Sequence, residues 1–262
     1  RLSRSKICRY CMGKSTIIQS LILLRQSYMM NDLDMGMNLK GDLCDAGISG
    51  ELACQSSNQH HLNIELKFEN QDDLIYQFQY PDNIMDTLLP GERTNIIDKN
   101  ILSKYSLFND CFQYLSAFRF GPQKIYNRDT SLVVNKKQIS KNMGQCEYAV
   151  HFLEQYKNMN IPIEGLAIKD DNDLDVDYRL STQVEQWLRK ISPNIKIKIE
   201  PIGEDLKLRY RFNREENTIT ENMTALNTGF GITYVLPILI AVLSASKGSI
   251  ILIENPEAHI HP

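Results

Sequence analysis

The sequence lacks several features that define broad classes of protein. Its longest apolar run, residues 232–245, is interrupted by Pro237 and is shorter than the ~18 residues that a membrane helix needs. The run therefore predicts a buried helix, and we expect no membrane contact. A formal net charge of −3 gives no overall attraction for nucleic acid. The 262 residues contain no internal repeat and no low-complexity tract, and this length suits one large domain or a core with a sizeable insertion.

The cysteines indicate the redox environment of the protein, and the two ends of the chain indicate whether the domain is complete. Six cysteines are scattered through a sequence without a secretory signal, which favours reduced thiols and a cytoplasmic location over a disulfide framework. There is no initiating methionine, and residues 249–262 pass from an apolar strand directly into a loop. We therefore expect an incomplete domain, truncated at both ends.

Hydrophobic periodicity predicts an α/β fold with four parts. An amphipathic helix follows a loop within residues 13–30. Residues 60–120 are β-rich, with an antiparallel hairpin over 61–69 and 74–81 and a strand at 112–117. Residues 145–192 form a helical insertion. The last part, residues 195–262, contains two alternating strands, a glycine-rich loop, a buried helix and a buried strand that ends in acids.

The letters GKST at residues 13–16 match the second half of a phosphate-binding loop. In such a loop, backbone N–H groups and the start of the next helix surround the phosphates. Lys14 would reach the outer phosphates, and the hydroxyl of Ser15 would hold Mg²⁺. Four letters are a weak signal, and an ordinary helix cap is the alternative interpretation.

The first glycine of the phosphate-binding pattern is missing, because Cys8 stands in its place. This glycine usually adopts a backbone conformation that a side chain resists. Residues 1–12 are also a poor match for the apolar strand that precedes such a loop. We hypothesise that residues 1–12 are frame-shifted or otherwise altered, and that the ordinary loop resumes at Gly13.

The segment SIILIENPE provides a second motif, in which an apolar strand ends in Glu254. A buried strand of this kind delivers a carboxylate to the edge of a sheet, and carboxylate oxygen is a ligand that Mg²⁺ accepts. GKST and Glu254 are the two halves that one magnesium-nucleotide site requires.

A third motif indicates a family. LNTGFGITYVLPILIAVL followed by GSIILIENPEAHIHP resembles the signature loop and Walker B strand of predicted ABC-type ATPases, relatives of the SMC, RecF and OLD proteins that are often described as AAA-domain proteins. GKSTIIQSLILLRQS, YLSAFRFGPQ and VEQWLRKISPNIKIKIE are also similar to this group, so the resemblance covers most of the chain. It implies a P-loop NTPase fold with an ABC-ATPase-head-like sheet, an antiparallel β layer and a helical insertion in a single head.

The resemblance also implies roles for individual residues. ATP and Mg²⁺ would be the cofactors, and the metal ligands would be Ser15 and Glu254. Phosphate would be bound by Gly13, Lys14, Ser15 and Thr16. The signature loop would close on the γ-phosphate held by a second subunit, so that catalysis needs a head-to-tail homodimer, and its residues would be Asn227, Gly229, Phe230, Gly231 and Thr233.

The sequence departs from the family pattern at the catalytic position. A glutamate that polarises the attacking water usually follows the magnesium-side acid, but Asn255 stands there, and its amide cannot accept a proton. Glu257 is the nearest substitute. His259 and His261 follow and would line the subunit interface or cap the exit of the strand.

These patterns leave two readings of function and disfavour a third. The resemblance implies ATP hydrolysis at a dimer interface, in DNA maintenance or phage defence, with a nuclease and DNA as possible partners. The alternative is a catalytically inactive, nucleotide-binding remnant. A DNA-binding module with its own basic surface has no sequence feature behind it.

Three further signals receive an ordinary interpretation. Cys8 and Cys11 lack two more zinc ligands at finger spacing. The acidic segment 169–177 lacks the glycine and glutamate of a calcium loop. Arg119 follows the strand at 112–117, and the family resemblance allows it a functional role, but an arginine after a strand is usually a surface charge.

Overall fold

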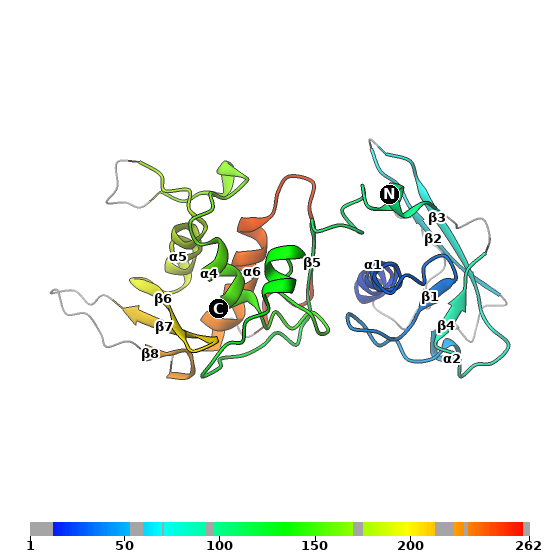
Figure 1. Ribbon diagram of the computed structural model, residues 1–262, viewed down its shortest axis with the longest axis horizontal. Coiled ribbons are helices and arrows are strands. Elements are labelled where there is room, and N and C mark those ends of the chain that lie inside the picture. The colour runs from blue at the N-terminus through cyan, green and yellow to red at the C-terminus, as the bar shows by residue number, and fades with distance from the viewer. Residues whose placement is uncertain are drawn as a thin grey trace. The chain divides into compact units, whose positions relative to one another are not determined.

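The computed structural model describes residues 13–52, 60–69, 71–92, 97–169, 175–212, 223–227 and 230–258. The chain divides into two compact units, residues 1–109 and residues 110–262 (Figure 1). The predictions for residues 1–12, for Gly229, and for His259 and His261 lie outside the described residues. The expectation of a single ATPase head stays a prediction.

The first unit combines one long helix with short antiparallel β-structure (Figure 1). Its elements are α1 (Gly13–Met29), β1 (Gly36–Asn38), α2 (Ser49–Leu52), β2 (His61–Leu66), β3 (Leu74–Gln79), β4 (Leu88–Pro90) and α3 (Lys99–Leu102). The helix that we predicted after the GKST letters is confirmed, and it begins at Gly13.

The predicted hairpin of the first unit is confirmed. Strands β2 and β3 pair antiparallel, from His61 opposite Gln79 to Leu66 opposite Leu74. Buried and exposed residues alternate along β3, as expected for a strand with one face on the core. A second antiparallel pair, β1 with β4, was not predicted from the sequence. An antiparallel β layer is therefore present in this unit.

Buried polar side chains attach α1 to the rest of its unit. The Arg25 guanidinium donates hydrogen bonds to the carbonyls of Leu107 (3.0 Å) and Asn109 (2.8 Å). The Ser27 hydroxyl accepts a hydrogen bond from the backbone N–H of Asn38 at 2.8 Å, which links α1 to β1. Buried polar groups need such partners, so these bonds fix the orientation of the helix that carries GKST.

The second unit contains the larger core. Its elements are β5 (Phe112–Leu115), the π-helical turn η2 (Ser131–Asn135), α4 (Ala149–Tyr156), η3 (Glu164–Leu166), α5 (Leu180–Ile191), β6 (Ile195–Ile202), β7 (Asp205–Phe212), β8 (Met223–Thr224), η4 (Ala225–Asn227), α6 (Phe230–Ser244) and β9 (Ile250–Ile253).

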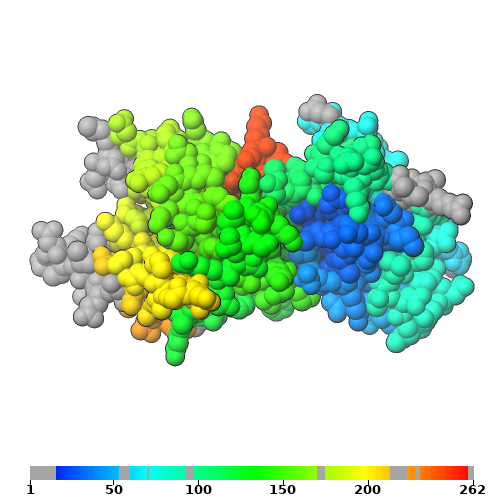
Figure 2. Space-filling view, in the orientation of Figure 1, coloured from blue at the N-terminus to red at the C-terminus, as the bar shows by residue number. Residues whose placement is uncertain are grey.

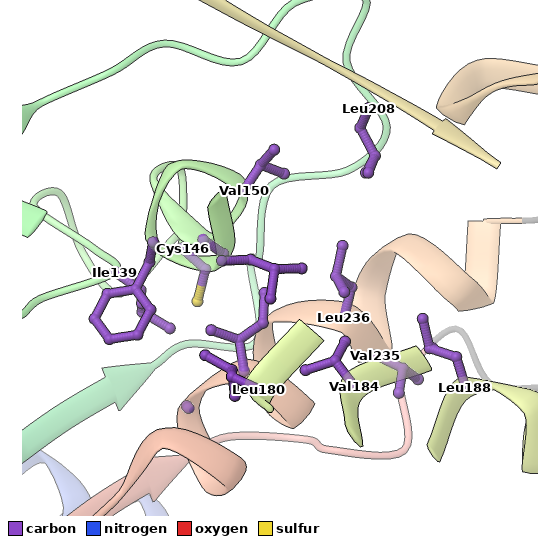
Figure 3. Packing of buried hydrophobic residues seen from close by; sticks show 14 of the residues in the cluster. Ile139, Cys146, Val150, Leu180, Val184, Leu188, Leu208, Val235 and Leu236 are labelled. Carbon is purple, nitrogen blue, oxygen red and sulfur yellow. The ribbon is translucent and has the colours of Figure 1, made fainter. Parts of the chain in front are cut away.

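Helix α6 lies in the middle of this core, against α4 and α5. Figure 3 shows an apolar stripe of α5, made by Leu180, Val184 and Leu188, next to Val235 and Leu236 of α6. The stripe repeats every four residues, which is the spacing of one helix face. The prediction of a buried helix is thus confirmed, and no helix in the described part of the chain is long and apolar enough to cross a membrane.

Two sheets complete the second unit. Strands β6, β7 and β8 form an antiparallel sheet, in which β6 and β7 are the two alternating strands that we predicted. The outer edge of β6 is covered by α5, because Glu185 accepts a hydrogen bond from the Ile197 N–H (3.0 Å) and Arg189 donates one to the Ile195 carbonyl (3.2 Å). The other pair, β5 with β9, is parallel. The structure therefore confirms a mixed α/β fold.

Candidate functional site

The exits of β5 and β9 lie side by side. The two strands pair in parallel from Phe112 opposite Ile250 to Leu115 opposite Ile253. The Glu254 N–H then donates to the Leu115 carbonyl at 2.9 Å, which extends the ladder by one residue. Because parallel strands point the same way, their carboxyl ends meet at one edge of the sheet, the usual position of ligands in α/β folds.

Glu254 stands at this edge with its carboxylate half-buried. The Oε2 atom accepts a long hydrogen bond of 3.4 Å from the N–H of Ala117, in the loop that follows β5. A carboxylate offers about four lone-pair sites, and within the described part of the chain this bond leaves most of that capacity for a ligand. Glu254 therefore suits the role of a hard oxygen ligand for Mg²⁺.

Arg119 is a component of the site that the sequence interpretation missed. The sequence left a functional role open but favoured a surface charge, and the surface charge was wrong, because the residue is only 3% exposed. Its Nη1 atom donates to the carbonyls of Ser116 (2.8 Å) and Glu254 (2.7 Å), and its Nη2 atom donates to the carbonyl of Asn255 (2.9 Å). One guanidinium thus joins the exits of β5 and β9. The available signals were its place shortly after a buried strand and the family-like segment YLSAFRFGPQ, and neither shows where β9 emerges.

The charge of Arg119 is partly compensated by its surroundings. Burial lowers the pKa of the guanidinium, and nearby Cys146, Glu257 and Tyr234 act in the opposite direction. Burial also raises the pKa of the Cys146 thiol, against the influence of Arg119, so this cysteine is neutral at physiological pH. Glu257 is therefore the acidic group that favours the cationic form of Arg119.

Asn255 has a structural reason to occupy the position after Glu254. Its φ angle is +43°, in the left-handed region that asparagine tolerates better than most residues. The carbonyl of Asn255 accepts a hydrogen bond from the Ala258 N–H at 3.0 Å, which closes a turn. Glu257 lies within this turn and is exposed. The turn thus brings a second carboxylate to the exit of β9.

The residues predicted for the signature loop differ in exposure. Asn227 ends η4 and is exposed, whereas Gly231, in the first turn of α6, is half-buried. Phe230 begins α6. Thr233 is buried, with 3% of its surface exposed, and its side chain lies next to Tyr210. The binding roles of these residues stay predictions.

The predicted phosphate-binding residues lie in the first turn of α1. Gly13, Lys14 and Ser15 have helical backbone, their side chains fall outside the described residues, and Thr16 is half-buried. They belong to the first unit and Glu254 belongs to the second. Their joint role in one site stays a prediction.

The described residues contain no group of three or more His, Cys, Asp or Glu side chains that could hold a metal ion. Magnesium in nucleotide sites needs only one or two protein ligands beside phosphates and water. Cys8 and Cys11, considered for zinc, and residues 170–174 of the acidic segment lie outside the described residues.

Comparison with known proteins gives one match. Residues 12–262 match the model of a protein family described as "AAA domain, putative AbiEii toxin, Type IV TA system". The match therefore spans nearly the whole chain, including the GKST letters and the exit of β9. No curated protein and no solved structure matches the chain.

Proposed function

We propose that this chain, which belongs to the AAA-domain family that matches residues 12–262, binds ATP with Mg²⁺ and hydrolyses it. One observation carries the proposal: the parallel pairing of β5 and β9 brings Glu254 to the carboxyl edge of a sheet, where Arg119 holds the backbone in place. The first turn of α1 carries the GKST motif at a helix N-terminus, and this motif is the phosphate-binding counterpart of Glu254.

Each group has a distinct role in this proposal. Backbone N–H groups at the start of α1 and the side chain of Lys14 bind the phosphates. Ser15 and Glu254 hold Mg²⁺, which neutralises charge on the phosphates when it is bound. Thr16 also binds phosphate.

Glu257 is our candidate for the group that accepts a proton from the attacking water. Asn255 cannot take this role, because a neutral amide does not accept a proton at physiological pH. Glu257 is exposed and follows within the same turn, so it can reach a water molecule at the edge of the sheet. Arg119 acts on the backbone of the turn and not on the substrate.

We further propose that two copies of the chain act together, with the signature loop of one copy closing on the nucleotide of the other. The exposure of Asn227 supports this role. The family description names a type IV toxin–antitoxin system, which favours phage defence as the setting over DNA maintenance. A cytoplasmic location, a nuclease partner and DNA are further expectations.

The experiment is a measurement of ATP binding and magnesium-dependent ATP hydrolysis by the purified chain. We expect Lys14→Ala to abolish both. We expect Glu257→Gln to retain binding and to lose turnover by about 10²- to 10⁴-fold, the usual effect of removing a general base. Glu164→Gln, which neutralises an exposed glutamate of η3, is the control and should change neither quantity.

A second candidate function follows from Asn255, which stands where the family usually has the catalytic glutamate. ATP binding without turnover in the unmodified chain would favour the inactive, nucleotide-binding remnant. Turnover that persists in Lys14→Ala, or the absence of any ATP binding, would contradict the main proposal.

A further inference from the structure

A short loop lies against the exit of β5. It comprises residues 140–146, and we call it the bracing loop. The Gly144 carbonyl accepts a hydrogen bond from the Ser116 N–H at 2.8 Å, and the Gln145 carbonyl accepts one from the Phe120 N–H at 2.7 Å. The bracing loop therefore holds the segment between these two amides at both of its ends.

The ends of the bracing loop are fixed in the core of the second unit. Ile139, directly before the loop, and Cys146, its last residue, belong to the apolar cluster, where Figure 3 shows both of them. The Tyr148 N–H donates to the Ile139 carbonyl at 3.0 Å, which ties the chain before the loop to the chain after it. Residues 141–143 are exposed, in the green part of the chain that reaches the surface in Figure 2.

The backbone of the bracing loop is strained. Met143, Gly144 and Cys146 have φ angles of +47°, +67° and +63°, so left-handed residues are concentrated here. A residue other than glycine adopts this conformation at an energetic cost, and keeps it only where the surrounding structure holds it. Such outliers gather at functional sites, so the side chain that holds this loop is a candidate for a functional role.

Glu147, the residue after the bracing loop, closes it. Its Oε1 atom accepts hydrogen bonds from the Lys141 N–H (3.1 Å) and the Asn142 N–H (2.9 Å), and its Oε2 atom accepts one from the Ser140 hydroxyl (3.2 Å). The Ser140 oxygen in turn accepts a hydrogen bond from the Cys146 N–H at 3.2 Å. Hydrogen bonds to an ionised acceptor are stronger than neutral ones. Glu147 therefore holds the first half of the loop directly and its end through Ser140.

The bracing loop sets the direction of the backbone beside Glu254. The Leu115 carbonyl faces β9, because it accepts a hydrogen bond from the Glu254 N–H. The N–H of Ser116 faces the bracing loop, and the next one, that of Ala117, faces the Glu254 carboxylate at 3.4 Å. The hydrogen-bonding groups thus alternate between the two sides of the chain. Because the Ser116 N–H is fixed on Gly144, the Ala117 N–H is directed to Glu254.

We propose that Glu147 is a positioning residue of the candidate magnesium site: through the bracing loop it fixes the Ala117 N–H, and this N–H orients the Glu254 carboxylate. The inference rests on the proposed function, in which Glu254 is a magnesium ligand. In this role Glu147 contacts neither the metal nor the nucleotide. Arg119 holds the exit of β9 at the same edge of the sheet, and Glu147 holds the exit of β5.

The test measures two quantities on the purified chain. The first is the rate of hydrogen exchange at the amides of Ser116 and Phe120, followed by NMR without nucleotide. The second is the magnesium concentration that gives half-maximal ATP hydrolysis. Glu147→Ala removes all three hydrogen bonds of the carboxylate. Glu147→Gln removes the charge but keeps an oxygen for the two backbone N–H groups. The control, Glu154→Ala, removes a half-buried glutamate of α4 that pairs with Lys157 at 2.8 Å.

We expect Glu147→Ala to accelerate exchange at both amides and to raise the magnesium requirement about 10-fold, as is typical when a group that orients a metal ligand is lost. ATP binding without magnesium should not change, because the phosphate-binding residues belong to the first unit. Glu147→Gln should restore most of both properties, and the control should change neither. Partial unfolding lowers the maximal rate but does not shift the magnesium midpoint, so this readout separates positioning from a loss of stability.

A milder variant keeps the test decisive if Glu147→Ala does not fold. Ser140→Ala loses only the hydrogen bonds to Glu147 and to the Cys146 N–H. It should shift the magnesium requirement and the exchange rates in the same direction by a smaller factor. A folded Ser140→Ala variant that matches the unmodified chain in both quantities would contradict the proposal.

Three other results would overturn the proposal. They are an unchanged magnesium midpoint in folded Glu147→Ala, an equal shift in the Glu154→Ala control, and a loss in Glu147→Gln as large as in Glu147→Ala, which would indicate a direct chemical role. If the unmodified chain hydrolyses no ATP, the proposed function fails by itself. Exchange then decides: faster exchange at Ser116 in Glu147→Ala supports the assigned role of Glu147, and unchanged exchange refutes it.

Discussion

Replacement of Arg119 by alanine tests whether this buried side chain holds the exits of β5 and β9 together. The change removes three hydrogen bonds from a charged donor, to the carbonyls of Ser116, Glu254 and Asn255. Two of the three bonds connect segments that are far apart in the sequence. The loss should therefore be felt in the stability of the whole second unit.

The expected magnitude follows from the burial of the three carbonyls. A hydrogen bond to a charged group contributes about 1.5–3 kcal/mol. Asn255 is exposed, so water can replace its bond, and the bond to Ser116 is local. We therefore expect Arg119→Ala to lower the free energy of unfolding by about 3 kcal/mol. Arg119→Lys keeps the charge but loses the planar fork of donors, and should lose about half as much.

Urea unfolding followed by tryptophan fluorescence is a suitable assay. The chain has one tryptophan, Trp187 of α5, whose indole N–H donates to the Leu166 carbonyl at 2.9 Å. The signal therefore reports on the second unit alone. Arg128→Ala, which removes an exposed arginine of the same unit, is the control and should stay within about 0.5 kcal/mol of the unmodified chain. If Arg119→Ala unfolds at the same urea concentration as this control, the assigned role of Arg119 is wrong.

Two further predictions concern backbone strain and pH. Gly144 and Gly203 both have left-handed backbone, with φ of +67° and +60°. A Cβ added at Gly144 would lie 2.7 Å from the Tyr114 side chain, whereas a Cβ added at Gly203 would meet nothing within 4 Å. We expect Gly144→Ala to cost about 1–3 kcal/mol more than Gly203→Ala, measured by the same unfolding assay; equal costs would refute the steric argument. Hydrogen bonding to Arg179 lowers the pKa of the Asp177 carboxyl, so its stabilisation is present above the ordinary aspartate pKa of about 4 and is lost as pH falls through the folded-state pKa. Thermal unfolding should show that Asp177→Asn destabilises the chain at pH 7 and that the difference shrinks in acid; a difference that does not change with pH would contradict this assignment.

Local patterns were enough to predict the longer elements of both units. The hairpins β2–β3 and β6–β7 alternate apolar and polar residues, and this alternation fixes both the strand and the face that is buried. The start of α1 at Gly13 follows from the GKST letters, although the first glycine of the loop is missing. These features depend on residues that are close together in the sequence, so they can be predicted from local sequence patterns.

The candidate site was only partly predictable, because its parts come from distant segments. Glu254 could be identified from the apolar strand before it. The asparagine after it looked like a loss of function, whereas its left-handed backbone gives Asn255 a structural role. Arg119 was misread, because its burial depends on the carbonyls that β9 brings to it.

By itself, the sequence determined the order of the elements, the apolar helix α6 and the letters that indicate a magnesium-nucleotide site, because each is encoded in the spacing of adjacent residues. Only the tertiary structure decided that β5 pairs in parallel with β9 and that the Arg119 guanidinium is buried between their exits. These pairing partners and this burial depend on contacts between residues far apart in the chain, and no local pattern encodes them.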